Sequence, residues 1–206
     1  MKPVLHLMLL ALSVCAGSTF AAALIQTGTP VYRGSGCPKN SVAITFAPDN
    51  LSFSVIYDKM VANLAAGDKR RQEIKACEIW IPVTLPSHSE LSIDNIDYRG
   101  FVALPTAGHA AIHAGYGFWP SVNQSCQAGG HFTRKFAAPF MDEYLISTGV
   151  FDAANKPTSA CGGTVYLRLA DSLHLRAKKG NDAQITLDSA DGALSAQYSL
   201  SLKTCK

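Results

Sequence analysis

The stretch SAQYSLSLK, from Ser195 to Lys203, decides the fold class. Its apolar residues occupy every second position, at Ala196, Tyr198, Leu200 and Leu202. Because side chains along a β-strand point alternately to the two faces of a sheet, this period places all four apolar residues on one face. We therefore predict an amphipathic strand with one side in a hydrophobic core.

Segments of the same kind recur along the chain and are separated by turn-forming residues such as Pro48-Asp49-Asn50. The further predicted strands cover residues 41–46, 51–57, 73–85, 89–104 with a break at Arg99-Gly100, 111–119, 132–136, 144–151, 164–169, 172–177 and 184–188. We expect 164–169 and 172–177 to form a strand pair. The pattern predicts an all-β fold, an antiparallel β-sandwich, and leaves jelly-roll and immunoglobulin-like topologies both open.

Two regions follow this pattern less clearly. Residues Lys59 to Glu73 contain a candidate helix, but Gly67-Asp68 and the basic run Lys69-Arg70-Arg71 favour a loop. Residues 120–163 contain the fewest clear strands and many Gly, Pro and Ser residues. If the domain carries a functional insertion, we expect it in that second region, because binding residues concentrate on loops.

The N-terminus has the composition of a secretory signal peptide. Lys2 is basic, an apolar run covers Val4 to Ala16, and Ala21-Ala22-Ala23 offers a cleavage site of small residues. The run is shorter than the roughly 20 residues that span a bilayer, and we predict no transmembrane segment elsewhere. We expect cleavage after Ala23, with Ala21 as second choice. Residues 24–206 then form a single secreted domain, extracellular or periplasmic.

Composition excludes several classes of protein. With 48% hydrophobic and 16% charged residues in 206, the chain can bury a core and is not intrinsically disordered. The formal net charge is only +3. No aromatic residues interleave the basic cluster at Lys69 to Arg71, so we do not expect nucleic-acid binding.

Cysteine usage agrees with export. Cys15 leaves with the signal peptide, and Cys37, Cys77, Cys126, Cys161 and Cys205 remain. An oxidising compartment favours disulfides, and an odd number leaves one thiol over. If the strands follow one another up and down, strand parity brings Cys37 to Cys77 and Cys161 to Cys205, although four cysteines allow three connectivities. Each bridge would close a loop of about 40 residues.

Several short motifs resemble one family of small secreted proteins. They are Gly34-Ser35-Gly36-Cys37-Pro38, Tyr98-Arg99-Gly100-Phe101, Ala160-Cys161-Gly162-Gly163, Asp188-Ser189-Ala190-Asp191-Gly192 and the final Cys205. In this order they resemble the secreted domain-of-unknown-function family number 4360. The resemblance implies a secreted β-rich domain and carries no known catalytic residues. Cys126 has no counterpart in the family pattern, which makes it the candidate for the odd thiol.

Histidines provide the candidate metal site. His109 and His113 are four residues apart in the run HAAIH, and His131 follows later. On a strand the first two imidazoles share a face but lie about 13 Å apart, too far for one metal ion. Since no Glu stands between them, the run is not the HExxH metalloprotease motif. A metal site would need His131 to join His113 across neighbouring strands; otherwise these are ordinary surface histidines, and we expect no cofactor.

Aromatic residues provide the candidate binding site. The run Tyr116-Gly117-Phe118-Trp119-Pro120 places aromatic rings on both faces of one strand. Either both faces are buried, or one ring is exposed. An exposed aromatic face packs well on the apolar C–H surface of a sugar. We take Tyr116, Trp119 and the nearby Arg99 as candidate ligand-binding residues.

The motifs favour a binding protein over an enzyme. No Gly-x-Ser-x-Gly or CxxC motif occurs, and acidic pairs such as Asp94 and Asp97 fall on opposite faces of a regular strand. We therefore expect a secreted, non-catalytic protein that binds a polysaccharide, a cell surface or a host partner. The alternative is a secreted hydrolase or effector that uses the His109, His113 and His131 region with Cys126 or Asp142.

Overall fold

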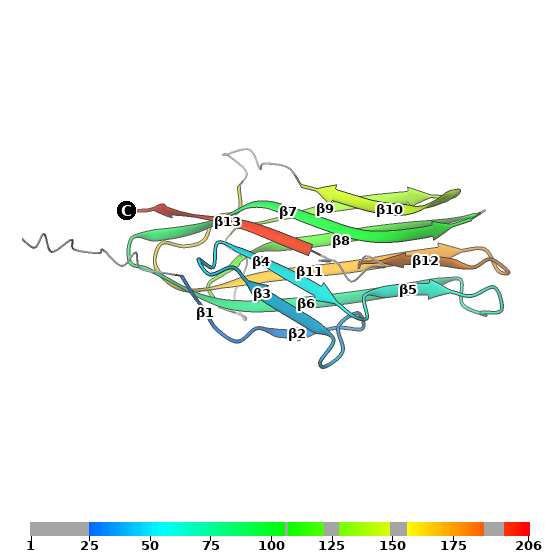
Figure 1. Cartoon of the computed structure of the whole chain (residues 1–206), viewed down its shortest axis with the longest axis horizontal. Coiled ribbons are helices and arrows are strands. Elements are labelled where there is room, and N and C mark those ends of the chain that lie inside the picture. The colour runs from blue at the N-terminus through cyan, green and yellow to red at the C-terminus, as the bar shows by residue number, and fades with distance from the viewer. Residues whose placement is uncertain (1–24, 106, 122–127, 149–155, 188–195) are drawn as a thin grey trace, which may run out of the picture.

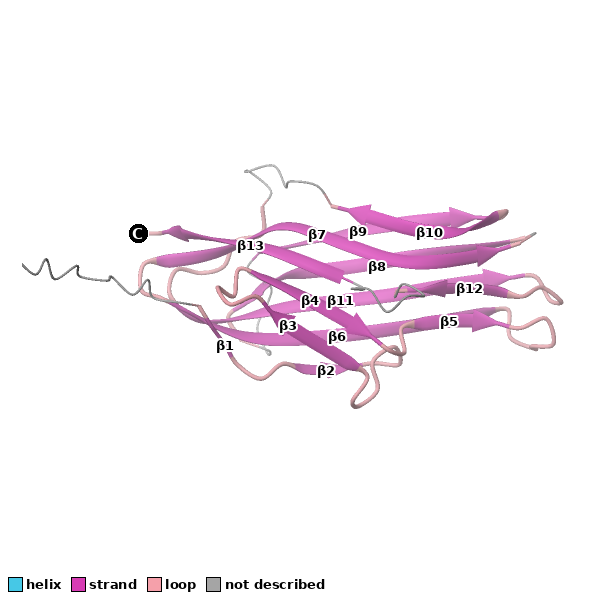
Figure 2. Cartoon of the chain, in the orientation of Figure 1, coloured by secondary structure: helices cyan, strands magenta, loops and turns pink. Residues whose placement is uncertain are grey.

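A computed structural model describes residues 25–105, 107–121, 128–148, 156–187 and 196–206. Within these residues the chain forms thirteen strands and no helix (Figure 2). Figure 1 shows the strands running along the long axis of the molecule. The signal peptide expected at residues 1–23 and the odd thiol Cys126 lie outside the described residues. No helix in the described part of the chain has the length and hydrophobicity needed to cross a membrane.

The first sheet has six antiparallel strands. They are β1 (Gln26–Thr27), β2 (Val31–Arg33), β6 (Gln72–Leu85), β8 (Gly108–Trp119), β9 (Ala128–Ala137) and β11 (Gly163–Ala177). The order is β1-β6-β11-β8-β9, and β2 also pairs with β6, at Glu78 to Trp80, whereas β1 pairs with Val83 and Thr84. The three long strands β6, β11 and β8 therefore form the centre of this sheet.

The second sheet has seven antiparallel strands. They are β3 (Val42–Phe46), β4 (Ser52–Tyr57), β5 (Val61–Leu64), β7 (Ser89–Leu104), β10 (Phe140–Ser147), β12 (Ala183–Thr186) and β13 (Ala196–Thr204). The order is β3-β4-β13-β7-β12-β5, and β10 also pairs with β7. Strand β7 is thus the partner of three other strands in this sheet.

Period-two alternation builds the core between the sheets. On β13, Ala196, Tyr198 and Leu200 are buried, whereas Gln197 is exposed. On β6, Ile79 is buried. Fully burying an aliphatic side chain of this size contributes about 1.5–3 kcal/mol, so one continuous cluster of such residues holds the two sheets face to face. The predicted all-β antiparallel sandwich is confirmed.

Two predicted breaks within strands are wrong. Strand β11 runs without interruption, because Ala170-Asp171 is not a turn: Asp171 points into the core and accepts hydrogen bonds from two tyrosine hydroxyls. Strand β7 also runs through Arg99-Gly100. A Cβ on Gly100 would lie 2.1 Å from the Thr186 carbonyl oxygen and 2.5 Å from the Tyr144 hydroxyl, so this glycine makes room for packing rather than ending a strand.

Other predictions of the local structure were incomplete. The helix considered at Lys59 to Glu73 is absent from the structure, and this region contains the short strand β5 and a turn. Residues 120–163 contain β9 and β10 among their described parts. The up-and-down order is wrong, because the consecutive strands β6 and β7 belong to different sheets.

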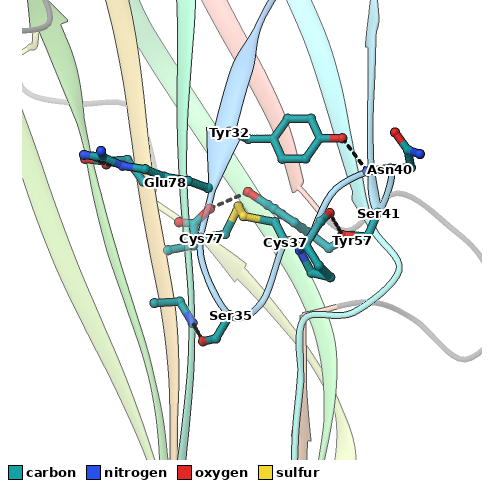
Figure 3. Close-up of a disulfide and its surroundings, with 12 residues drawn as sticks. Tyr32, Ser35, Cys37, Asn40, Ser41, Tyr57, Cys77 and Glu78 are labelled. Carbon is teal, nitrogen blue, oxygen red and sulfur yellow. Dashed lines mark hydrogen bonds and ion pairs between the residues drawn. A yellow bond between two sulfur atoms is a disulfide. The ribbon is translucent and has the colours of Figure 1, made fainter.

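Both predicted disulfide pairs are present. Cys37 pairs with Cys77 at a Cα–Cα distance of 5.3 Å, and Cys161 pairs with Cys205 at 5.9 Å. The pairs form although the strand order differs from the one assumed. Cys37 lies in the connection between β2 and β3, beside Cys77 on β6 (Figure 3). Cys205 donates its backbone N–H to the carbonyl of His88, in the β6–β7 turn, and this contact holds the C-terminus beside Cys161.

The Gly34-Ser35-Gly36 run fastens this connection to β6. The Gly36 amide donates to the Ala76 carbonyl at 2.8 Å, and the Ala76 amide donates to the Ser35 hydroxyl at 3.1 Å. A Cβ on Gly34, whose φ is +142°, would lie 2.1 Å from the Ala76 carbonyl oxygen. The two glycines therefore allow the backbone to approach β6 closely enough for the disulfide to form.

Candidate functional site

The outer face of the six-stranded sheet presents a continuous surface of side chains. On β6 and β11 the even-numbered residues point away from the core, and on β8 the odd-numbered residues do so. The register places these positions side by side: Trp80 pairs with Arg168, and Arg168 pairs with Gly117. Chemistry-bearing side chains from several strands therefore converge on this face.

An aromatic and arginine cluster occupies one part of the outer face. The rings of Trp80 and Trp119 meet edge to face, with centroids 5.6 Å apart. The Arg168 guanidinium lies 5.4 Å from the Trp80 ring centroid and 5.2 Å from that of Trp119. Tyr166 pairs with Trp119 on the next strand. Each cation–π contact contributes about 0.5–1 kcal/mol at a partly exposed site, so the three side chains order one another.

Glu78 holds the two arginines at this cluster. Arg168 Nε donates to Glu78 Oε1 at 2.5 Å, and Arg33 Nε donates to Oε2 at 2.8 Å. Partial burial raises the pKa of the Glu78 carboxyl, but hydrogen bonds from Arg33 and Arg168 outweigh this effect and hold the pKa below its ordinary value. The Arg168 side chain is therefore fixed by a carboxylate on one side and by indole rings on the other.

Two hollows of about 500 Å³ each lie along the same face. The first borders the arginine cluster and is lined in part by Arg33, Ala76, Glu78, Arg168, Ala170 and Ser172. The second is lined in part by Ile74, His109, Ala111, Lys135, His174 and Arg176. Small residues such as Ala170 and Ala111 form much of the floor, because their side chains end at Cβ. The face can therefore accommodate an extended ligand.

The structure does not bring the predicted histidine trio together in one group suited to a metal ion. His109 and His113 share the outer face of β8, and His131 pairs with Gly115 on β9. No group of three or more His, Cys, Asp or Glu side chains suited to a metal ion occurs within the described residues. Asp142 lies exposed on β10, a strand of the other sheet, and Cys126 is outside the described residues.

His113 instead contacts His174, which the sequence analysis did not identify. Their ring centroids are 4.5 Å apart, and the Thr133 and Ser172 hydroxyls lie within hydrogen-bonding distance of the two imidazoles. Partial burial and then the neighbouring His113 lower the pKa of His174. Strand alternation places His174 on the same face of β11 as Arg168, but only the pairing of β11 with β8 brings it to His113.

The three predicted binding residues are separated in the structure. Trp119 belongs to the outer-face cluster. Tyr116 points inward and is only 4% exposed, so its proposed role at a surface is wrong. Arg99 is exposed on β7, on the outer face of the other sheet. Trp80, Arg168 and Glu78 were missed because their convergence on Trp119 depends on the pairing of three strands distant in sequence.

A second polar cluster is buried between the sheets. Asp171 accepts hydrogen bonds from the Tyr57 hydroxyl at 2.7 Å and the Tyr98 hydroxyl at 3.1 Å. The Tyr98 and Tyr198 hydroxyls are 3.1 Å apart. Burial raises the pKa of Asp171 to about 6, although the two tyrosine hydrogen bonds act in the opposite direction. Since Asp171 is 1% exposed, this cluster links the sheets rather than facing a ligand.

Comparison with known proteins identifies the family. Residues 25–205 match the family described as "Domain of unknown function (DUF4360)". The chain belongs to the DUF4360 family. A curated relative, an "Uncharacterized secreted protein" of Arthroderma benhamiae, is 26% identical to this DUF4360 chain over 164 residues. The aligned region covers 78% of this chain and 63% of the relative, so the chain spans less than two thirds of that protein.

Two solved structures align with this DUF4360 protein at low similarity. One is TmCBM61 in complex with beta-1,4-galactotriose, with 10% identity, 85% of this chain and 88% of that chain covered, and a TM-score of 0.27. The other is the enzymatically active domain of bacteriophage CBA120 tailspike protein 4, with 14% identity, coverages of 84% and 19%, and a TM-score of 0.23. Both TM-scores are too low to support an argument about this protein.

Proposed function

We propose that this DUF4360 protein is a secreted, non-catalytic protein that binds a polysaccharide through the outer face of its six-stranded sheet. The cluster of Trp80, Trp119 and Arg168 on that face carries the proposal. Indole rings provide flat apolar surface for the C–H face of a sugar ring, and fixed charged groups provide hydrogen bonds to its hydroxyls. A mix of aromatic surface and a few placed polar groups is typical of binding sites for organic ligands.

The geometry of the cluster supports this function because its parts are ordered before any ligand binds. Arg168 contacts both indole rings and the Glu78 carboxylate. A side chain held in place loses little conformational entropy on binding, and such preorganisation increases affinity. The site also lies on three paired long strands rather than on loops, which keeps the spacing of its groups constant.

Several observations support secretion as part of the proposal. The two disulfides are of the kind that persists in an oxidising compartment, and the curated relative carries the word "secreted" in its name. We propose that residues 1–23 are removed as a signal peptide near Ala23 and that residues 24–206 form one secreted domain. Mass spectrometry of the protein recovered from the medium or periplasm tests this cleavage site, and a mature N-terminus far from residue 24 would contradict it.

Affinity electrophoresis through gels containing soluble polysaccharides tests the binding function. We expect retardation of the wild type by at least one polysaccharide. The double variant Trp80→Ala, Trp119→Ala should bind at least about 30-fold more weakly, since truncating a central tryptophan of an interface typically costs about 2 kcal/mol. The matched control is Phe101→Ala, which removes a partly exposed aromatic ring from the other sheet. If the polysaccharide gel retards the double variant and the control equally, and both circular dichroism spectra match that of the wild type, the assignment of binding to this face is wrong.

A further inference from the structure

The outer face of the six-stranded sheet carries an excess of positive charge. Among the described residues, its four permanently charged cations come from three strands, and its one carboxylate is Glu78. The cations are Arg33 on β2, Arg168 and Arg176 on β11, and Lys135 on β9. The resulting excess equals the formal net charge of the whole chain, +3. The outer face of the other sheet instead places Asp97, Arg99 and Glu143 on neighbouring strands β7 and β10. Positive charge is therefore concentrated on one face.

The spacing of these cations suits a polymer better than a small ion. Arg33 pairs with Glu78 on β6, and Arg176 pairs with Gln72, six residues further along the same strand. At about 3.3 Å per residue, these two positions are roughly 20 Å apart along the strands. Lys135 lies two strands from β11, opposite Ala111, so the charges extend across the sheet as well.

The same cations line the two hollows of this face. Arg33 and Arg168 line the first hollow, and Lys135 and Arg176 line the second. Arg33, Lys135 and Arg176 are exposed, and the Arg33 side chain retains 80% of its accessible surface although it pairs with Glu78. An extended ligand lying along this face would therefore meet indole rings at one end and separated cations along the rest of its path.

We infer that the ligand is an acidic polysaccharide whose carboxylates repeat along the chain. The inference rests on the proposed function and specifies its ligand class. Arginine pairs with carboxylates through charge-assisted hydrogen bonds in a matched planar geometry. Arg33 and Arg168 share the single carboxylate of Glu78, so the face keeps an excess of positive charge that repeated carboxylates would complement and a neutral glycan would not. Because the disulfides point to an extracellular setting, an extracellular acidic glycan fits better than an intracellular polyanion.

Binding to polygalacturonate, and to the same polymer after methyl esterification, tests the ligand class. Esterification removes the negative charges and keeps the sugar backbone. Alginate and hyaluronate serve as further acidic probes, and dextran and a neutral galactan as further neutral ones. We expect at least one acidic polymer to bind, affinity to fall with added salt, and esterified polygalacturonate to bind about tenfold more weakly than the acidic form if that polymer is the ligand.

The triple variant Arg33→Ala, Lys135→Ala, Arg176→Ala tests the face itself. Loss of three exposed charge contacts should weaken binding of the acidic polymer about tenfold. The matched control, Lys59→Ala, Arg99→Ala, Lys203→Ala, removes the same charge at exposed positions elsewhere and should retain affinity. All six positions are exposed, so both variants should fold, which unfolding curves will verify.

The outcomes separate this inference from the proposed function. Equal binding of acidic and neutral polysaccharides would overturn the acidic ligand and leave polysaccharide binding in place. Equal loss of affinity in the two triple variants would overturn the assignment to this face. Binding to none of the polysaccharides would overturn both proposals. Binding only to single-stranded DNA or to phosphatidylserine vesicles, included as polyanion controls, would assign the face to another class of partner and overturn the inference.

Discussion

The substitution Asp171→Asn should remove the part of the pH dependence of stability that comes from the titration of this buried carboxyl. Asp171 belongs to the six-stranded sheet, and its partners Tyr57 and Tyr98 belong to the seven-stranded sheet. In the folded protein, burial raises the pKa of Asp171 from 3.8 to about 6. Between those two values the folded state binds the proton more tightly than the unfolded state does. The contribution to stability is therefore fully present below pH 3.8 and is lost as the pH rises through 6.

The magnitude follows from the size of the shift. One pKa unit corresponds to 1.36 kcal/mol, so the shift of Asp171 corresponds to about 3 kcal/mol of unfolding free energy over the whole titration, of which about 2 kcal/mol falls between pH 4 and pH 7. The asparagine carboxamide stays neutral and can still accept a hydrogen bond from a tyrosine hydroxyl. The wild type should accordingly lose about 2 kcal/mol relative to the variant as the pH rises from 4 to 7.

Urea unfolding of both proteins at pH 4, 5, 6 and 7, with the disulfides intact, measures this difference. The comparison of wild type with variant cancels the titration of all other groups. Tyr98→Phe serves as a second perturbation: it removes a hydrogen bond that lowers the pKa of Asp171 and should move the transition to higher pH. A stability difference that is constant over this range, or that favours the wild type more at pH 7 than at pH 4, would refute the reasoning.

The remaining predictions concern packing, the disulfides and the cluster. Gly34→Ala should lower the unfolding free energy by about 1–3 kcal/mol, measured by urea unfolding, because its Cβ would meet the Ala76 carbonyl oxygen; an unchanged midpoint would contradict this. Cys161→Ser, which opens the bridge to Cys205, should lower the thermal midpoint and cost about 4 kcal/mol, and a loss below 1 kcal/mol would be inconsistent with the 44-residue separation. Arg168→Lys should keep the charge yet weaken polysaccharide binding and alter the near-ultraviolet circular dichroism of the tryptophans, whereas identical spectra would argue against the indole contacts.

Local pattern predicted the strands well where one face is buried. In β13 and β6, period-two alternation separated the core residues from the exposed ones, and both strands occur near their predicted positions. The pattern failed at Asp171, where a charged residue among small ones resembled a turn. A carboxyl can occupy the core there only because tyrosines from the opposite sheet donate hydrogen bonds to it, and those partners are 73 and 114 residues away in the chain.

The residues of the candidate site also divide into those predicted from the neighbouring sequence and those that only strand pairing brings together. Trp119 was predicted from the residues next to it in the chain, because aromatic residues on both faces of one strand are unusual. Tyr116 was misassigned, since alternation alone does not tell which face of a strand meets the core. Trp80 and Arg168 come from β6 and β11, and nothing local connects them to Trp119 on β8. The same holds for His174, which replaces the expected His131 beside His113.

The amino-acid sequence by itself determined the strand class and the alternation of the core, because these depend on residue type at short spacing. The two cysteine pairs were predicted from an up-and-down strand order that the structure does not have, so the tertiary structure decided them. Only the tertiary structure decided the sheet order and register, and with them the assembly of Trp80, Trp119, Arg168 and Glu78 on one face. Register has this effect because a shift of one residue turns every side chain of a strand to the opposite face. The hydrogen bonds between strands that set it join residues far apart in the chain.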